Sequence, residues 1–245
     1  SITLTGTTSV GPVTYSIGTG GIAGAYQTSP IFSINAAGLY DVFIKDGNGC
    51  IATTTYVVQP ALLLDANMTQ DLTCIVDASI TLTPSGGTGI YTTYEVDYNG
   101  GGYGAIAGSP YTAIVDGTYQ FRVTDSQGCQ SESNIIIVTP KTAPTLTHTQ
   151  TDVSCNGGSD GSIVVTGANG IAPYQYSIDN GVTFQASNVF NGLSAGPYDV
   201  VVIDSKSCVS PATIVTITEP ALVGGTIVLT QGLTCGAGNA TQAAI

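Results

Sequence analysis

Polar and apolar residues alternate with a period of two in many short stretches of the chain, and no stretch shows the 3.6-residue period of a helix. The clearest examples are Ser1–Gly6, Ser79–Thr83 and Ser162–Gly167. Successive side chains of a strand point to opposite faces of a sheet, so this alternation predicts half-buried strands. Turn residues recur about every 8 to 12 positions, and that spacing is typical of a β-sandwich.

One segment occurs three times, at Gly38–Cys50, Gly117–Cys129 and Gly196–Cys208. Each copy begins with glycine, has tyrosine two residues later, and ends with an aspartate turn and a cysteine. Equivalent residues lie 79 positions apart. A regular repetition of this kind predicts tandem structural repeats rather than one large domain.

Prolines mark the boundaries between these repeats. A β-branched run precedes each of Pro60, Pro140 and Pro220, and proline lacks the N–H group that a strand ladder needs. We therefore predict an all-β protein of tandem Ig-like β-sandwich repeats, about 80 residues each, in an extended array. The predicted segments are an Ig-like repeat without its first strand, two complete repeats, and the start of a fourth, at residues 1–60, 61–140, 141–220 and 221–245.

Composition excludes several classes of function. The 245 residues include only 4 Lys and Arg against 16 Asp and Glu, for a net charge of -12. Binding to nucleic acid needs clustered basic residues, so no nucleic-acid partner is expected. No apolar run approaches the roughly 20 residues of a membrane-spanning helix, so no membrane insertion is expected.

Catalytic residues are scarce. The chain has one histidine, His148, and its serines and aspartates lie at separate turn positions, so no triad can be assembled from the sequence. We predict that the protein is not an enzyme and that it needs no cofactor, with calcium as the one alternative.

Two kinds of segment offer oxygen ligands. The repeated turn that begins at Asp46, Asp125 or Asp204 favours a carboxylate that caps its own turn over a calcium site. The segment Asn156–Gly161 is a better calcium candidate through Asn156 and Asp160, although it has few acidic residues.

Tyrosines suggest two different roles. Tyr40, Tyr119 and Tyr198 each follow a glycine turn at the start of a long strand, where a buried ring with its hydroxyl on the backbone is expected. Tyr98 and Tyr103 flank a glycine-rich stretch, and we predict them as candidate ligand contacts.

The six cysteines occupy equivalent positions in successive repeats, without a CxxC motif, which predicts disulfides and an oxidising compartment. Pairing within repeats joins Cys74 to Cys129 and Cys155 to Cys208 and leaves Cys50 and Cys235 to other partners. Pairing across the boundaries joins Cys50–Cys74, Cys129–Cys155 and Cys208–Cys235. We favour the first pattern because each sandwich then has its own cross-link.

The third repeat carries a resemblance to a known family. The residues that carry this resemblance are Ser154–Ile163, Pro173–Ser177 and Gly192–Asp204, followed by Cys208 and Glu219–Pro220. These segments resemble the SprB-type repeat of Bacteroidetes surface adhesins, an Ig-like module similar to PKD-type modules. The resemblance implies export by the type IX secretion route, display on the bacterial cell surface, and a role in adhesion or gliding motility.

The predicted function is a non-enzymatic extracellular repeat array of a bacterial surface adhesin or filament. Two alternatives are carbohydrate-binding accessory modules of a secreted enzyme and a self-assembling structural fibre. The expected partners are surface glycans, other cell-surface proteins, neighbouring repeats, or identical chains in a filament.

Overall fold

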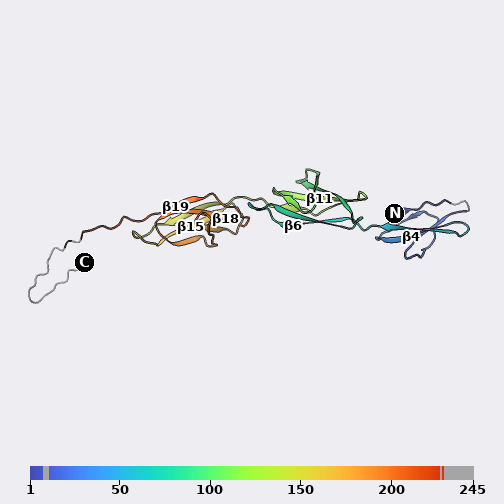
Figure 1. Ribbon diagram of the computed structural model, residues 1–245, viewed down its shortest axis with the longest axis horizontal. Helices are drawn as coiled ribbons and strands as arrows, with labels where there is room; N and C mark the ends of the chain where they lie inside the picture. The colour runs from blue at the N-terminus through green and yellow to red at the C-terminus, as the bar shows by residue number, and fades with distance from the viewer. Residues whose placement is uncertain (8–10, 227, 229–245) are drawn as a thin grey trace, which may run out of the picture. The chain divides into compact units, whose positions relative to one another are not determined.

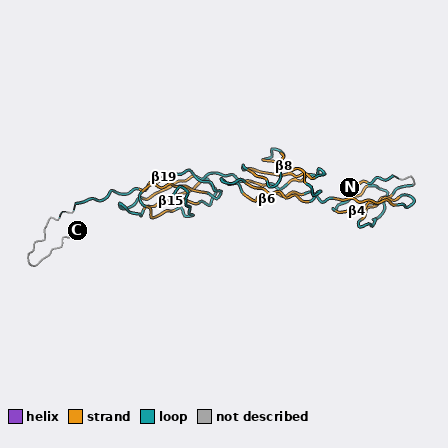
Figure 2. Tube along the Cα trace, viewed as in Figure 1, coloured by secondary structure: helices purple, strands orange, loops and turns teal. Residues whose placement is uncertain are grey.

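The computed structural model describes all residues except 8–10, 227 and 229–245. The described residues form strands, turns and loops without a helix, and the prediction of an all-β, Ig-like protein is confirmed (Figure 2). Consequently, no helix in the described part of the chain is long and apolar enough to cross a membrane. Two compact units are present, Ser1–Lys141 and Thr142–Ile245.

The first predicted repeat contributes two small sheets, blue in Figure 1. One sheet has the order β1-β3 and the other β2-β4-β5. Its buried apolar side chains include Val42 and Phe43 of β4. The strands are β1 (Ile2–Thr3), β2 (Thr14–Gly18), β3 (Ile31–Phe32), β4 (Gly38–Lys45) and β5 (Ile51–Val58).

The second predicted repeat is a sandwich of two antiparallel sheets with the orders β10-β7-β6 and β12-β11-β8-β9, and β13 also pairs with β11. Alternate residues of β11 point inward, so Tyr119, Phe121 and Val123 are buried in a core with Leu72 and Ile80. The strands are β6 (Leu63–Gln70), β7 (Ala78–Ser85), β8 (Tyr91–Tyr98), β9 (Tyr103–Ile106), β10 (Tyr111–Ala113), β11 (Gly117–Asp125), β12 (Gln130–Glu132) and β13 (Ile136–Val138).

The third predicted repeat has the same plan, with sheets β14-β15-β17 and β16-β18-β19. Ile163 and Val165 of β15 pack with Val200 and Val202 of β18 in its core. The strands are β14 (Thr145–Thr151), β15 (Gly161–Ala168), β16 (Gln175–Ser177), β17 (Val189–Leu193), β18 (Gly196–Ile203) and β19 (Thr213–Ile217). The predicted start of a fourth repeat, at residues 221–245, lies largely outside the described residues.

The β-branched run of the second repeat forms a shorter strand than the sequence predicts. Of the run before Pro140, only Ile136–Val138 form a strand, β13, and the same arm contains a separate strand, β12, before it. Between them, the N–H of Ser133 donates to the Phe121 carbonyl, while the Phe121 N–H donates to Ser133 Oγ. The serine side chain therefore replaces one ladder hydrogen bond and interrupts the strand.

Candidate functional site

The repeated tyrosine at the start of β4, β11 and β18 anchors the loop that precedes it. The hydroxyls of Tyr40, Tyr119 and Tyr198 donate to the carbonyls of Ala36 (3.0 Å), Val115 (2.8 Å) and Ser194 (3.0 Å). Each acceptor lies four residues before its tyrosine. The predicted tyrosine corner is thus confirmed in all three copies, and these hydroxyls have a structural role.

The repeated aspartate closes the hairpin turn after the same strand. Asp46, Asp125 and Asp204 each accept two backbone N–H groups through Oδ1, from the residues two and four positions later, at 2.8–3.0 Å. Gly49 and Gly128 have positive φ in this turn, and Ser207 takes the same conformation with a φ of 58°. The prediction of a carboxylate that caps its own turn is confirmed.

Asp125 also connects this turn to the preceding sheet. Its Oδ2 accepts the N–H of Thr88, which follows β7. Burial opposes ionisation of this carboxyl, but the backbone N–H groups of Cys129, Thr88, Gln127 and Gly128 together lower the pKa of Asp125 below its usual range. The ionised carboxylate therefore holds two loops together at one end of the sandwich.

The segment proposed for calcium is held by its own hydrogen bonds. Asp160 accepts the backbone N–H and the hydroxyl of Ser154, at 3.0 and 2.6 Å, and these bonds lower the pKa of its carboxyl. The Asn156 side chain donates to the Pro220 carbonyl, and Glu219 accepts the N–H of Gly157. These bonds tie the loop to the C-terminal end of the repeat, and a calcium role for Asn156 and Asp160 stays a prediction.

Tyr98 and Tyr103, the candidate ligand contacts, have different surroundings. Tyr98 packs against Tyr119 on the core side of β8, with ring centroids 5.1 Å apart, and its hydroxyl donates to the Asp116 carbonyl at 2.8 Å. Tyr103 lies on the opposite face, under the guanidinium of Arg122 at 4.1 Å from the ring centroid. Of the two, only Tyr103 belongs to a polar surface.

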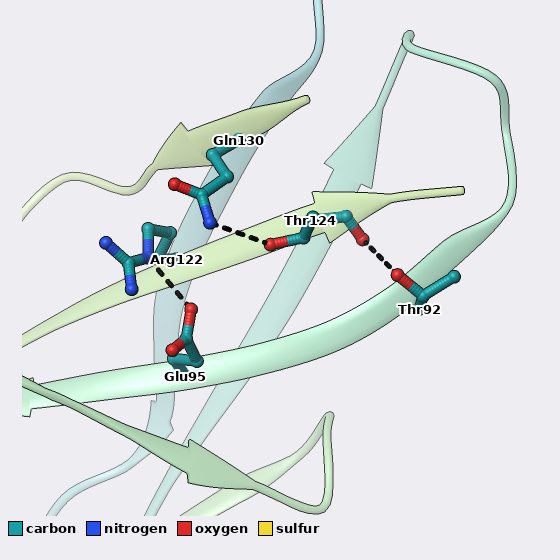
Figure 3. A network of polar contacts seen from close by, with 5 residues as sticks. All are labelled: Thr92, Glu95, Arg122, Thr124 and Gln130. Carbon is teal, nitrogen blue, oxygen red and sulfur yellow. Dashed lines mark hydrogen bonds and ion pairs between the residues drawn. The ribbon is translucent and has the colours of Figure 1, made fainter. Parts of the chain in front are cut away.

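That surface covers the outer face of the sheet β12-β11-β8-β9 (Figure 3). Arg122 Nε donates to Glu95 Oε2 at 2.8 Å, directly across from it in the β11–β8 register. Gln130 donates to Thr124 Oγ1, and the Thr92 hydroxyl donates to the Thr124 carbonyl (Figure 3). We call Thr92, Glu95, Tyr103, Arg122, Thr124 and Gln130 the polar face.

The charged groups around Arg122 shift one another's pKa values. Its hydrogen bond lowers the pKa of the Glu95 carboxyl, and Glu95 in turn raises the pKa of Arg122. Burial, and then the carboxylate of Glu132, raise the pKa of Tyr103 to about 12. The phenol therefore remains protonated at neutral pH, and its hydroxyl is buried while its ring lies beneath a planar cation.

Sequence reasoning missed Arg122, the centre of this face, because an isolated arginine in a strand has no distinctive pattern. The missed signal was its place opposite Glu95, and only the strand register reveals that pairing. A second missed group is Asp179, which accepts the hydroxyls of Ser177 and Thr183 at 2.5 Å each in the third repeat. These bonds lower the pKa of Asp179 to about 2.

Neither predicted set of disulfides agrees with the structure. Cys50, Cys129 and Cys155 are free and exposed, while Cys74 and Cys208 are disulfide-bonded. The free thiols of Cys129 and Cys155 exclude both within-repeat pairs. The free thiol of Cys50 excludes the boundary pair Cys50–Cys74, and those of Cys129 and Cys155 exclude the boundary pair Cys129–Cys155. The proposed pair Cys208–Cys235 involves a residue outside the described part of the chain.

The strand directions explain why the within-repeat pairs fail. Cys74 lies between β6 and β7, beyond the pair Gln70–Ser79, whereas the turn of Cys129 contacts Thr88 beyond the opposite end of β7. Strands of this length separate the two ends by about 20 Å. A disulfide spans at most about 7 Å between Cα atoms. Cys155 and Cys208 are separated in the same way in the third repeat.

Chemistry-bearing side chains do not gather elsewhere among the described residues. No group of three or more His, Cys, Asp or Glu is placed there to hold a metal ion. His148 lies on β14, where it pairs with Val165 of β15. The absence of enzymatic activity stays a prediction.

The fold and its repeated anchors define the class of this chain as a tandem Ig-like β-sandwich repeat protein. The family model described as SprB repeat matches residues 66–95 and 147–183, so the resemblance to the SprB repeat is confirmed in the second and third predicted repeats. No curated protein sequence matches the chain.

Two solved structures are similar to the chain at low identity. One is the N-terminal eight Ig domains of Down Syndrome Cell Adhesion Molecule, isoform 1.30.30, with 13% identity, a TM-score of 0.30, and coverage of 84% of this chain and 31% of that one. The other is extracellular domains 3–5 of Drosophila OTK, with 12% identity, a TM-score of 0.27, and coverage of 85% and 86%.

Proposed function

We propose that this chain is a non-enzymatic repeat segment of a bacterial surface adhesin or filament, displayed outside the cell after type IX export and used in attachment or gliding. The observation that carries the proposal is the match of two segments to the SprB repeat. Cys74 and Cys208 are disulfide-bonded, which is consistent with an oxidising, extracellular environment.

The distribution of hydrogen bonds supports a scaffold role. The groups that recur in every repeat, the tyrosine corner and the aspartate turn, are used to hold the fold. The side chains that differ between repeats lie on outer faces and loops, such as the polar face of the second repeat and the Asp179 hairpin of the third. A constant frame with variable outer faces suits attachment better than catalysis.

Attachment can be tested with beads that carry the folded chain. We expect these beads to adhere to glass, agarose or mucin surfaces several-fold more than beads that carry the same chain after unfolding and alkylation. Antibodies against the chain should label intact cells of the source bacterium, and protease treatment of those cells should remove the label. Equal adhesion of both bead types, together with label found only after lysis, would contradict the proposal.

A carbohydrate-binding module is the second candidate, favoured by the polar face. A half-buried aromatic ring beside Arg122 and Glu95 combines a stacking surface with charged hydrogen-bonding groups. If sugars bind there, Tyr103→Ala removes binding on a glycan array, whereas Tyr56→Ala, which removes an exposed tyrosine of the first repeat, leaves it unchanged. Binding that survives Tyr103→Ala would exclude this face as the site.

A further inference from the structure

The two longest edge strands of the second and third repeats occupy equivalent places. Among the described residues of these repeats, β6 and β14 each form one edge of a sheet, and they have eight and seven residues. The outer side of an edge strand has backbone N–H and carbonyl groups without partners in its own sheet, and these groups can pair with another strand. The surroundings of β6 and β14 therefore decide whether each edge is closed or open.

The edge of β6 is closed by a side chain of its own repeat. Asn134 Oδ1 accepts the N–H of Ala66 at 2.9 Å, and Asn134 Nδ2 donates to the Ala66 carbonyl at 3.0 Å. The strand also has a register shift between Met68 and Gln70, and it contains a carboxylate, Asp65. An irregular register and a charged residue both discourage the addition of a strand.

The edge of β14 has none of these features. Its residues, Thr145–Thr151, pair with β15 without a register shift, and none of them is acidic, lysine, arginine or proline. His148 takes the place of Ala66 in the register with the central strand of its sheet. His148 is exposed, and no described residue caps its backbone in the way that Asn134 caps Ala66. The edge of β14 is therefore open.

The backbone of His148 points to this open edge. On the far side of β15 from β14, the N–H of Val165 donates to the Asn188 carbonyl at 2.9 Å, and the Val165 carbonyl accepts the Asn188 side chain at 3.0 Å. Both backbone groups of Val165 therefore face away from its partner His148, and the antiparallel pattern turns the N–H and carbonyl of His148 outward as well. The same alternation turns those of Leu146 and Gln150 outward.

The sequence of β14 is complementary to itself. Threonine occupies every second position on both sides of His148, in Thr145-Leu146-Thr147-His148-Thr149-Gln150-Thr151. In an antiparallel pair of two such strands with His148 opposite His148, each threonine faces a threonine of the other copy. Cross-strand threonine pairs stabilise antiparallel sheets, whereas like charges placed opposite each other destabilise them. The net charge of -12 opposes association of two chains, but this strand carries no carboxylate.

We propose that the β14 edge of one chain pairs with the β14 edge of a second copy, antiparallel and centred on His148. The N–H and carbonyl groups of Leu146, His148 and Gln150 then bond across the contact, and the sheet β14-β15-β17 of each chain becomes half of one continuous sheet. Because the same strand serves both partners, the contact has twofold symmetry and closes as a dimer. Such pairing joins two chains laterally, and it does not depend on the proposed role in attachment.

The first measurement is the weight-average mass of the 245-residue chain by sedimentation over a range of concentrations, with exposed thiols alkylated. His148→Glu places two carboxylates opposite each other at the centre of the pair, and His148→Gln is its uncharged control. Thr166→Glu adds the same charge at an exposed position of β15, one strand away from the edge. We expect the mass of the native chain and of both controls to approach that of a dimer, while His148→Glu associates at least tenfold more weakly.

Hydrogen exchange of individual amides identifies the strand that makes the contact. The N–H groups of Leu146 and His148 point to the open edge, so we expect them to exchange freely in the monomer and slowly in the dimer. Those of Thr147 and Thr149 bond to β15 and should be protected in both states.

Three outcomes overturn the proposal. The first is a native chain that stays monomeric, even if an added peptide strand protects the His148 amide. The second is equal association of His148→Glu and Thr166→Glu. The third is a dimer in which the amides of Leu146 and His148 still exchange freely, because the contact then lies elsewhere. Dimerisation and bead adhesion are measured separately, so failure of either leaves the other standing.

Discussion

At the residue scale, the repeated side chains act mainly as hydrogen-bonding anchors. The tyrosine hydroxyl fixes the loop before the long strand, and the aspartate carboxylate fixes the turn after it. Burial differs between copies, since Tyr119 is 2% exposed while Tyr40 is half-buried. A hydrogen bond lost in the interior leaves an unsatisfied carbonyl, so the same substitution has different costs in different repeats.

Replacement of Tyr119 with phenylalanine tests this anchor. Tyr119→Phe keeps the ring but removes the donor to the Val115 carbonyl, so we expect a loss of about 1 to 2 kcal/mol in the free energy of unfolding. Tyr40→Phe is the matched control and should cost less. Urea unfolding followed by tyrosine fluorescence measures both. Equal effects of the two substitutions would mean that burial does not govern the anchor.

The Asp179 hairpin predicts a pH dependence. Its folded pKa of about 2 is below the value of about 3.9 usual for an unfolded chain, so the ionised form stabilises the fold. This stabilisation is complete above about pH 4 and is lost as the pH falls toward 2. We expect Asp179→Asn to have a lower urea midpoint than the wild type at pH 7. This difference in urea midpoint should be smaller at pH 2. A constant difference across this range would contradict the assignment.

At the element scale, the turns that connect the two sheets need backbone conformations that the sequence supplies with glycine. Gly86 follows β7 with a φ of +72°, and a Cβ at that position would lie 2.0 Å from the carbonyl oxygen of Ala61. Its neighbour Gly87 donates its N–H to the Pro60 carbonyl. This close approach connects the end of β7 to the start of the repeat.

Gly86→Ala should therefore destabilise the second repeat by more than the conformational cost of placing alanine at a positive φ. Gly100 has the same φ of +72° with open space around its Cα, so Gly100→Ala is a matched control that carries only the conformational cost, about 1 kcal/mol. Hydrogen exchange of the β6 and β7 amides can compare the two variants. If both lose the same protection, the contact with Ala61 does not constrain this turn.

At the scale of the whole molecule, the cysteines are arranged by strand direction rather than by sequence spacing. Each complete repeat has one cysteine at each end, so a repeat cannot close its own disulfide. Cys74 and Cys155 occupy equivalent positions, yet Cys74 is disulfide-bonded and Cys155 is a free, exposed thiol.

Differential alkylation and peptide mapping of the native chain should reflect this difference. We expect Cys50, Cys129 and Cys155 to react with iodoacetamide before reduction, and Cys74 and Cys208 to react only after it. The equivalent pair Cys74 and Cys155 is an internal control for intrinsic reactivity. Recovery of a peptide that links Cys74 to Cys129 would instead support pairing within the repeat.

The sequence by itself was sufficient to predict the features that depend on neighbouring residues. The period of two predicted strands, and the positions of Tyr119 and Asp125 in the repeated segment predicted the anchors before and after β11. In each case the interacting groups lie within a few residues of one another, so no knowledge of the sheet order is required.

Only the tertiary structure decided which distant residues meet. The pairing of Arg122 with Glu95 depends on the register of β11 against β8, and a shift of one residue would place these side chains on opposite faces. The separation of Cys74 from Cys129 depends on which ends of the strands share an edge of the sandwich. Spacing along the chain gives a contour length, whereas disulfides and ion pairs depend on distance in space.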